Sequence, residues 1–332
     1  MILSVSRRTD IPAFYSDWFF KCLEDGFALV PNPINPKKIA KIPLKKFEII
    51  DVSTNLVGDK NIETKGNIEG IVFWSKNPKP LLNQIDKLKD FVFYFLYTLN
   101  PYPNWIEGGL PPLEDRLKTF RELSHHCPVI WRYDPILFAD GIDVKWHIKN
   151  FKYLCENLKG YTKHCKISFV IESYSGCSKS VHAPSEKDKN ILLENFSKIA
   201  KENGIQIEAC AESGDWSKYG IVPSKCIGGE IFEELLTEKY ADLGLTFKRK
   251  NNKIDGQRKN CGCMPAVDVG RYDTCNHKCN YCYARKAKHT SMYDIPQGEI
   301  YDRKTELEFE IIKKQCLTLK QFDSNWQQMY QF

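Results

Sequence analysis

The chain has 332 residues, of which 42% are hydrophobic and 27% are charged. This length and composition allow a large buried core and exclude extensive disorder. The formal net charge of +6 arises from 48 basic and 42 acidic residues, a balance that neither requires nor excludes an anionic partner.

The longest apolar run, residues 91–99, has about half the length of a membrane-spanning helix and fits a buried strand better. Residues 1–10 lack a basic region followed by a long apolar stretch, so we expect no secretory signal and a cytoplasmic location. The thirteen cysteines would then remain reduced, which makes metal binding more plausible than a disulfide framework.

In chain order, short apolar segments alternate with longer amphipathic ones, a pattern typical of a parallel α/β fold. The pattern predicts strands over residues 2–6, 48–53, 71–75, 92–98, 129–133, 166–172, 205–211 and 267–271, with a further short strand over 27–30. It predicts helices over 12–25, 80–88, 113–124, 144–158 and 186–203. Gly26, Gly160 and Gly204 follow three of these helices, as helix C-caps do.

Eight β-α repeats favour a (β/α) TIM-like barrel, complete or circularly permuted, with its chemistry at the carboxyl ends of the strands. An open doubly wound sheet is the main alternative. Neither a Gly-x-Gly-x-x-Gly segment after the first strand nor a Gly-Lys-Ser/Thr loop supports a nucleotide fold. We assign residues 1–297, with the cysteine-rich loop 261–285, to the barrel domain. Residues 298–332 would form a C-terminal helical extension with a helix over 305–315.

Three cysteines with the spacing Cys-x-x-x-Cys-x-x-Cys directly follow the last predicted strand: Cys275, Cys279 and Cys282. Three thiolates on one tight loop can bind three irons of a [4Fe-4S] cubane, leaving the fourth iron open. The alternative is a structural zinc site made of Cys261 and Cys263 with the last two of these cysteines, or of His277 with three thiolates. By itself, His277 is more typical of a solvent-facing loop.

This segment resembles the cluster motif of the radical S-adenosylmethionine superfamily, including Tyr281 just before the third cysteine. The resemblance implies that the amino and carboxylate groups of S-adenosylmethionine chelate the open iron, and that an electron passed through the cluster breaks a carbon–sulfur bond. It also implies a reductant such as a ferredoxin or flavodoxin as partner, with Tyr281 and Tyr283 beside the cofactor.

A wider likeness involves residues 6–12, 73–78 and 131–136 together with the terminal Cys-Tyr-Ala, which resemble a bacterial and archaeal family known as domain of unknown function 1848. The Cys-Tyr-Ala ending is also similar to the cluster loop of spore photoproduct lyase over a short stretch. One departure is that radical S-adenosylmethionine enzymes usually carry the cysteines after the first strand. A closed barrel would make the first and last strands neighbours. Gly228-Gly-Glu230 resembles the segment that holds the methionine amino group, although a helix entry explains it better.

A second metal site is also predicted. Cys210 lies at the end of a predicted strand, Cys226 in the following loop, and Cys261 and Cys263 before the last strand. Four thiolates would complete an auxiliary [4Fe-4S] cluster. Alternatively, Cys210 is a small buried residue and the other three have no shared role.

Several predicted strands end in charged residues, where a barrel enzyme places its substrate contacts. Side chains alternate along a strand, so Arg132 would share a face with Asp134, and Glu208 would share one with Cys210 and Glu212. The catalytic candidates are Arg132, Asp134, Glu172 and Glu212.

The candidates for cofactor contact are Arg7, Arg8, Asp10, Lys76 and Asn77, which follow the first and third predicted strands. An arginine there could bind the carboxylate of S-adenosylmethionine. The alternative is that these charges pair with one another beneath the loops. As a group they indicate a small polar substrate, such as one with a carboxylate or phosphate.

The sequence therefore favours a radical S-adenosylmethionine enzyme that abstracts hydrogen from an unidentified polar substrate, or a variant that transfers an aminocarboxypropyl group. The alternative is a zinc or iron–sulfur protein, structural or nucleic-acid-binding, that does not cleave S-adenosylmethionine. It is less favoured because the basic residues form no dense cluster.

Overall fold

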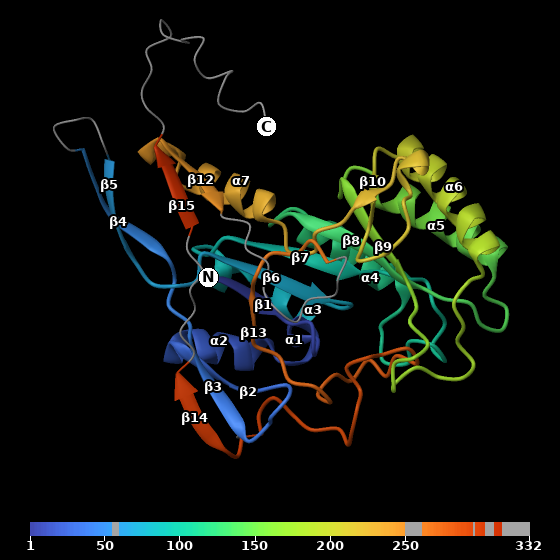
Figure 1. The fold of residues 1–332 in the computed structure, drawn as a ribbon, viewed down its shortest axis with the longest axis horizontal. Coiled ribbons are helices and arrows are strands. Elements are labelled where there is room, and N and C mark those ends of the chain that lie inside the picture. Colours follow the sequence, from blue (N-terminus) through green and yellow to red (C-terminus); the bar gives the residue numbers. More distant parts are fainter. Residues whose placement is uncertain (55–59, 250–260, 295, 303–308, 314–332) are drawn as a thin grey trace, which may run out of the picture.

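The computed structural model describes residues 1–54, 60–249, 261–294, 296–302 and 309–313. At its centre is a parallel sheet in the order β11-β10-β9-β8-β7-β6-β1-β13 (Figure 1). The strands are β1 (Ile2–Val5), β6 (Gly70–Ser75), β7 (Phe93–Thr98), β8 (Val129–Ile136), β9 (His164–Phe169), β10 (Gln206–Ala209), β11 (Val222–Pro223) and β13 (Val267–Asp268).

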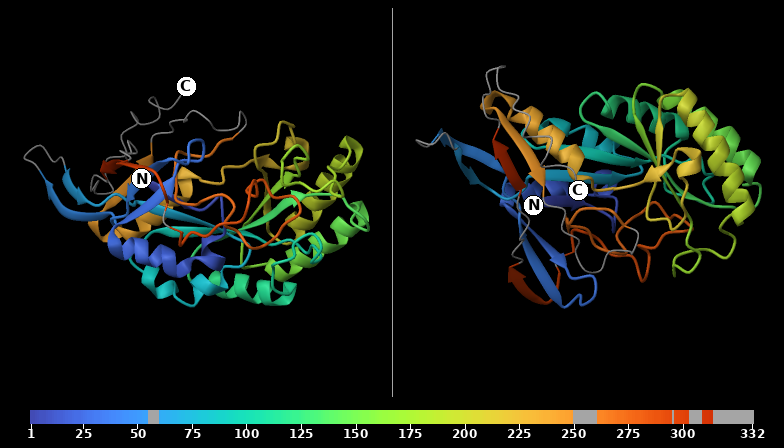
Figure 2. Two further views of the ribbon diagram at one scale, coloured as in Figure 1. Left: turned by 90° about the horizontal axis from the view of Figure 1, so that it is seen from below. Right: turned by 45° about the horizontal axis from the view of Figure 1, so that its top comes forward.

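From β1 to β11, each strand lies beside the previous one on the same side. Because parallel crossovers are right-handed, this order puts the crossover helices on one face of the sheet, here called the outer face (Figure 2). The helices are α1 (Ile11–Phe14), α2 (Ser16–Asp25), α3 (Lys79–Leu82), α4 (Leu113–Leu123), α5 (Val144–Leu158) and α6 (Glu186–Glu202), with short 3₁₀ turns η1 (Ile85–Leu88), η2 (Ser217–Tyr219) and η3 (Ala241–Leu243).

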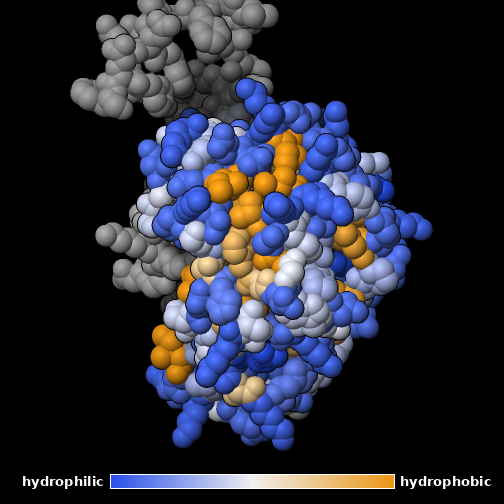
Figure 3. Space-filling view, turned by 90° about the vertical axis from the view of Figure 1, so that its right-hand side faces the viewer, coloured by the Kyte–Doolittle hydropathy of each residue, from blue (hydrophilic) through white to orange (hydrophobic). Residues whose placement is uncertain are grey.

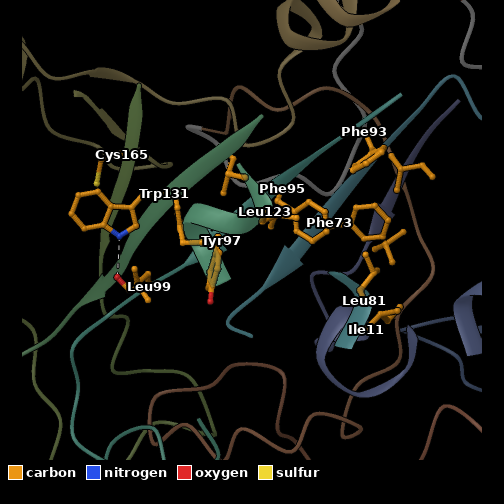
Figure 4. Packing of buried hydrophobic residues seen from close by; sticks show 14 of the residues in the cluster. Ile11, Phe73, Leu81, Phe93, Phe95, Tyr97, Leu99, Leu123, Trp131 and Cys165 are labelled. Carbon is orange, nitrogen blue, oxygen red and sulfur yellow. Dashed lines mark hydrogen bonds between the residues drawn. The ribbon is translucent and has the colours of Figure 1, made fainter. Parts of the chain in front are cut away.

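The outer core is aromatic (Figure 4). Phe73 stacks on Phe95 with ring centroids 4.7 Å apart, and the buried Trp131 indole donates a hydrogen bond to the Leu99 carbonyl at 2.9 Å. Two helix ends are explained by single residues of the sequence. The Asp143 side chain caps α5, and Gly26 ends α2 at φ +77°, a conformation that favours glycine.

The opposite, inner face of the sheet carries Tyr94 and Ile130 and is covered by α7 (Gly229–Lys239). The Phe232 ring of α7 lies 5.0 Å from the Tyr94 ring. The Tyr94 hydroxyl donates to the Cys226 carbonyl at 2.8 Å. The inner face therefore carries a core of its own, which includes four of the cysteines considered below.

Three small sheets lie outside the main one. They are β2 (Phe27–Pro31), β3 (Lys38–Pro43) and β14 (Glu299–Asp302); β4 (Glu48–Thr54) and β5 (Lys60–Lys65); and β12 (Leu245–Arg249) and β15 (Phe309–Lys313).

Two predictions need correction here. Residues 48–53 do form a strand, but it pairs with β5 in a hairpin and is not a member of the main sheet. Residues 309–313 form a strand instead of part of the predicted helix, because their backbone pairs antiparallel with β12 and the sequence Phe-Glu-Ile-Ile suits a strand. The remainder of the predicted helix over 305–315, and most of residues 298–332, lie outside the described residues.

The predicted parallel α/β fold is confirmed, but within the described residues the sheet ends at β11 and β13 and does not close into a barrel. The end strand β11 has two exposed residues, one of them Pro223, and short edges with proline resist pairing with other chains. The face around α5 and α6 is largely hydrophilic with a narrow hydrophobic band (Figure 3). None of the described helices combines the length and apolar character needed to span a bilayer.

Candidate functional site

The three-cysteine loop, residues 272–285, comes shortly after β13 in the chain. β13, the last strand of the main sheet in chain order, pairs with β1, the first. The Asp268 carboxylate accepts hydrogen bonds from the side chains of Ser4 (2.9 Å) and Ser6 (2.8 Å) and from the backbone amides of Arg7 (2.7 Å) and Gly270 (2.9 Å). A Cβ at Gly270 would lie 1.7 Å from Ser6 Oγ, so only glycine fits this approach. The predicted neighbouring of first and last strands is confirmed, and Asp268 joins them.

Asp10 and His277 fix the first part of the loop. Asp10 Oδ2 accepts from His277 Nε2 and from the Lys76 backbone amide, both at 2.7 Å. Asp10 Oδ1 accepts from Ser75 Oγ at 2.7 Å and caps α1 through the Ala13 amide. His277 is 2% exposed, so the expectation of a solvent-facing loop residue is wrong. The reason is that its imidazole binds Asp10, which in turn binds the end of β6.

Glu107 and Lys76 fix the second part of the loop, around Tyr281. The Lys76 ammonium donates to Glu107 Oε1 and to the Tyr281 hydroxyl, each at 2.8 Å, and the Tyr281 hydroxyl donates to the same carboxylate oxygen. Burial raises the pKa of Glu107, but the charges of Lys76 and Arg116 outweigh it and hold that pKa below its ordinary value. The buried ion pair therefore stays charged and positions Tyr281.

Backbone pairing on two sides completes the loop. Glu107 and Cys279 form an antiparallel bridge, as do Cys177 and Tyr281. The Asn280 amide donates to the Ile106 carbonyl at 2.9 Å. Lys278 adopts a left-handed backbone conformation with φ +54°, which turns the chain between the first two cysteines.

The three thiols of this loop lie close enough to influence one another. Burial raises the pKa of Cys275 to about 12, with Asp10 and Cys282 adding to the effect. Burial is also the main reason why the pKa of Cys279 is well above its ordinary value; Lys76 opposes it, and Cys275 and Cys282 add to it. A metal bound here would reverse this balance, because coordination removes the thiol proton.

Two arginines lie close to the ring of Trp74 on the inner face of the sheet. The guanidinium carbons of Arg7 and Arg132 lie 5.1 Å and 4.9 Å from the Trp74 ring centroid. Arg132 and Asp134 form an ion pair, which agrees with the prediction that they share a face of the strand. Within the described residues, Arg7 Nη2 and Arg132 Nε are buried without a hydrogen-bond partner, which leaves each able to bind an acceptor.

The other residues predicted to contact the cofactor have separate partners within the protein. Arg8 pairs with Asp268 at 3.6 Å and donates to the Gly270 carbonyl, and Tyr283, 43% exposed, donates through its hydroxyl to the Arg7 carbonyl. The structure gives Asn77 a hydrogen bond from its backbone amide to Ser75 Oγ.

Two predicted catalytic carboxylates accept hydrogen bonds from backbone amides. Glu172 is exposed and accepts from the Ala183 amide, and Glu212 accepts from the Phe169 amide at 2.9 Å. The predicted shared face of Glu208 and Cys210 does not extend to Glu212, because β10 ends at Ala209 and Ala211 has φ +55°, which breaks the alternation.

The structure does bring Cys210, Cys226, Cys261 and Cys263 together. The Sγ atoms of Cys210 and Cys226 are 3.2 Å apart, and the Cys263 thiol hydrogen-bonds to those of Cys226 and Cys261. The hydrogen bond from Cys263 is the main cause that lowers the pKa of Cys261 to about 6.

Within the described parts of the chain, no three or more His, Cys, Asp or Glu side chains are already arranged around a point that could hold a metal ion. A surface cavity lies at the amino-terminal edge of the sheet, lined in part by Ile85, Phe93, His126 and Lys239. Because parallel sheets bind ligands at their carboxyl edge, this cavity is a weaker candidate site than the loop.

Sequence reasoning missed two buried supports of the loop, Glu107 and Asp268, whereas Asp10 and Lys76 were among its candidates. Glu107 lies in an irregular segment between β7 and α4, where no periodicity marks it. Asp268 could have been found, since an acidic residue between Val267 and Val269 in a predicted buried strand requires partners.

The fold and site define an α/β protein with a cysteine-bearing loop at the carboxyl edge of its sheet. The chain belongs to the family described as Domain of unknown function (DUF1848), whose model matches residues 2–284. No curated protein and no solved structure matches the chain.

Proposed function

We propose that the protein is a radical S-adenosylmethionine-type enzyme that binds a [4Fe-4S] cluster through Cys275, Cys279 and Cys282. The observation that carries the proposal is the way the loop is held. Its His277 and Tyr281 side chains are engaged by Asp10, Lys76 and Glu107, which fixes the backbone on both sides of Cys279 within the short loop that carries all three cysteines at the carboxyl edge of the sheet.

The residues present fit such a cluster. Three thiolates on a short loop suit three irons, and no fourth protein ligand is needed when a substrate chelates the last one. When bound, the cluster supplies the electron that breaks a carbon–sulfur bond of S-adenosylmethionine. We further propose that the open sheet is an incompletely closed (β/α) barrel, because its strand order advances in one direction.

The chain's own residues would orient the reactants. Arg7 has a buried nitrogen with no partner among the described groups and could bind a carboxylate of S-adenosylmethionine or of a polar substrate. Lys76, which hydrogen-bonds to Tyr281, lowers the cost of placing negative thiolates beside it. A one-electron donor such as a ferredoxin or flavodoxin is the expected partner, and the reducing cytoplasm suits the many free thiols.

The test is anaerobic purification followed by iron analysis and reduction in the presence of S-adenosylmethionine. We expect about four irons per chain on this loop and release of 5′-deoxyadenosine. Release of methylthioadenosine would instead identify the aminocarboxypropyl variant. Cys279→Ala should abolish both the loop iron and the product, whereas Cys22→Ala, which changes a cysteine of α2, should leave both unchanged. A protein without iron, or a Cys279→Ala variant that still cleaves S-adenosylmethionine, would contradict the proposal.

A further inference from the structure

We infer that Cys210, Cys226, Cys261 and Cys263 form a second metal site, which binds a single zinc ion through four thiolates. This inference does not rest on the proposed function, because none of these residues belongs to the loop 272–285.

The first support is the contact pattern of the sulfurs. Cys210 and Cys226 have their Sγ atoms 3.2 Å apart, and Cys226, Cys263 and Cys261 continue as a chain of hydrogen-bonded thiols. Four sulfurs held about 2.3 Å from one tetrahedral ion lie about 3.8 Å from each other. The separation of the Cys210 and Cys226 sulfurs is therefore already near the spacing that a single ion requires.

The same spacing argues against a cubane at this position. A [4Fe-4S] cluster binds each thiolate to a different iron and so keeps the sulfurs apart, whereas here the Cys210 and Cys226 sulfurs touch. The four thiols form a chain and not yet a tetrahedron, in agreement with the lack of a preformed metal-binding group among the described residues. Rotation about χ1 between staggered positions moves a cysteine sulfur without moving the backbone, and this is the change that binding requires.

The second support is the charge around the sulfurs. Arg7 interacts electrostatically with Cys263 and Cys226, and Arg132 with Cys226 and Cys210. Zinc binding releases the four thiol protons and leaves a centre with two net negative charges. Two guanidinium groups balance that charge, and the unpartnered Arg132 Nε can donate to metal-bound sulfur.

The third support is where the four cysteines lie along the chain. Cys210 immediately follows β10, Cys226 precedes α7, and Cys261 and Cys263 lead into β13. Cys263 is held near Ile227 by a 3.4 Å hydrogen bond from the Ile227 amide to its sulfur. Since all four positions of the ion are filled by protein, the site is structural, and it would join the segment before the three-cysteine loop to the far side of the sheet.

Metal analysis of the full-length protein tests the inference. We expect about one zinc per chain in the wild type and less than about one tenth in Cys226→Ala. The matched control Cys165→Ala, a buried cysteine of β9, should keep its zinc. Cys279→Ala should also keep its zinc, so that loss of the iron site and loss of the zinc site are distinguishable.

If Cys226→Ala does not fold, replacement of zinc by cobalt(II) in the wild type provides a second measurement. Four-thiolate cobalt gives intense tetrahedral visible bands and sulfur-to-metal charge-transfer bands. Absence of these bands would overturn the inference. So would about eight irons per chain that fall to about four in Cys226→Ala, because that result identifies an auxiliary [4Fe-4S] cluster. A Cys210–Cys226 disulfide in protein purified without oxygen would overturn it as well.

Discussion

The ion pair of Glu107 with Lys76 has a natural comparison in the same molecule. Both this pair and that of Glu122 with Lys79 have an N–O distance of 2.8 Å. The Glu107 side chain is 1% exposed and the Lys76 side chain 16%, whereas the Glu122 and Lys79 side chains are 43% and 45% exposed. The two pairs therefore differ in burial but hardly in geometry.

Glu107→Ala leaves the buried ammonium of Lys76 without its carboxylate partner, with the Tyr281 hydroxyl as its remaining acceptor. The change also removes hydrogen bonds from Tyr281 and Asn100 to Glu107. Breaking a buried pair in this way costs about 3–5 kcal/mol of unfolding free energy. Glu122→Ala should cost about 1 kcal/mol or less, because the exposed pair is already solvated.

Urea unfolding followed by tryptophan fluorescence measures both values. In the double variant Lys76→Met/Glu107→Ala the cost should fall below the sum of the single changes by at least about 1 kcal/mol, because no unpaired ammonium remains. Equal losses for Glu107→Ala and Glu122→Ala, or a loss below about 1 kcal/mol for Glu107→Ala, would refute the role assigned to this buried pair.

Two further predictions concern other buried polar groups. Burial lowers the pKa of His147 from 6.5 to about 4, so the unfolded chain binds more protons between these pH values and stability falls as the pH drops from 6.5 to 4. His147→Gln should remove up to about 3 kcal/mol of that fall, as measured by urea unfolding across this pH range. An unchanged pH profile would contradict this prediction. Asp268→Ala should lower stability by about 3 kcal/mol or more, because four donors lose their acceptor, and hydrogen exchange at Arg7 and Gly270 should rise; protection equal to wild type would show that Asp268 does not join β1 to β13.

The sequence pattern was sufficient for elements whose core contacts repeat at regular intervals. The helix predicted over 144–158 is α5, and the strands predicted over 71–75 and 92–98 are β6 and β7. Closure of the sheet could not be predicted, because it depends on whether two distant end strands pair and not on either segment alone. The same limit explains residues 48–53, since the alternation that marks a strand does not say which sheet it joins.

At the site, the cysteine spacing is visible in the sequence, but not every support of the loop is. Three cysteines mark the loop 272–285, whereas Glu107 contacts it only after folding brings the segment before α4 against it. Polar residues at the strand ends are visible in the sequence as a group. Their individual roles depend on local backbone geometry, as Ala211 shows by turning Glu212 away from the expected face.

The pairing of β1 with β13 has a consequence for the order in which the protein matures. A ribosome releases β1 first, and β6 to β11 can add to one side of it while the other side waits for residues near the end of the chain. Residues 272–285 therefore reach their place on a sheet that has already formed. Under the proposed function, a cluster would be loaded late, and a chain truncated before β13 would keep most of the strands of the main sheet but lack this loop.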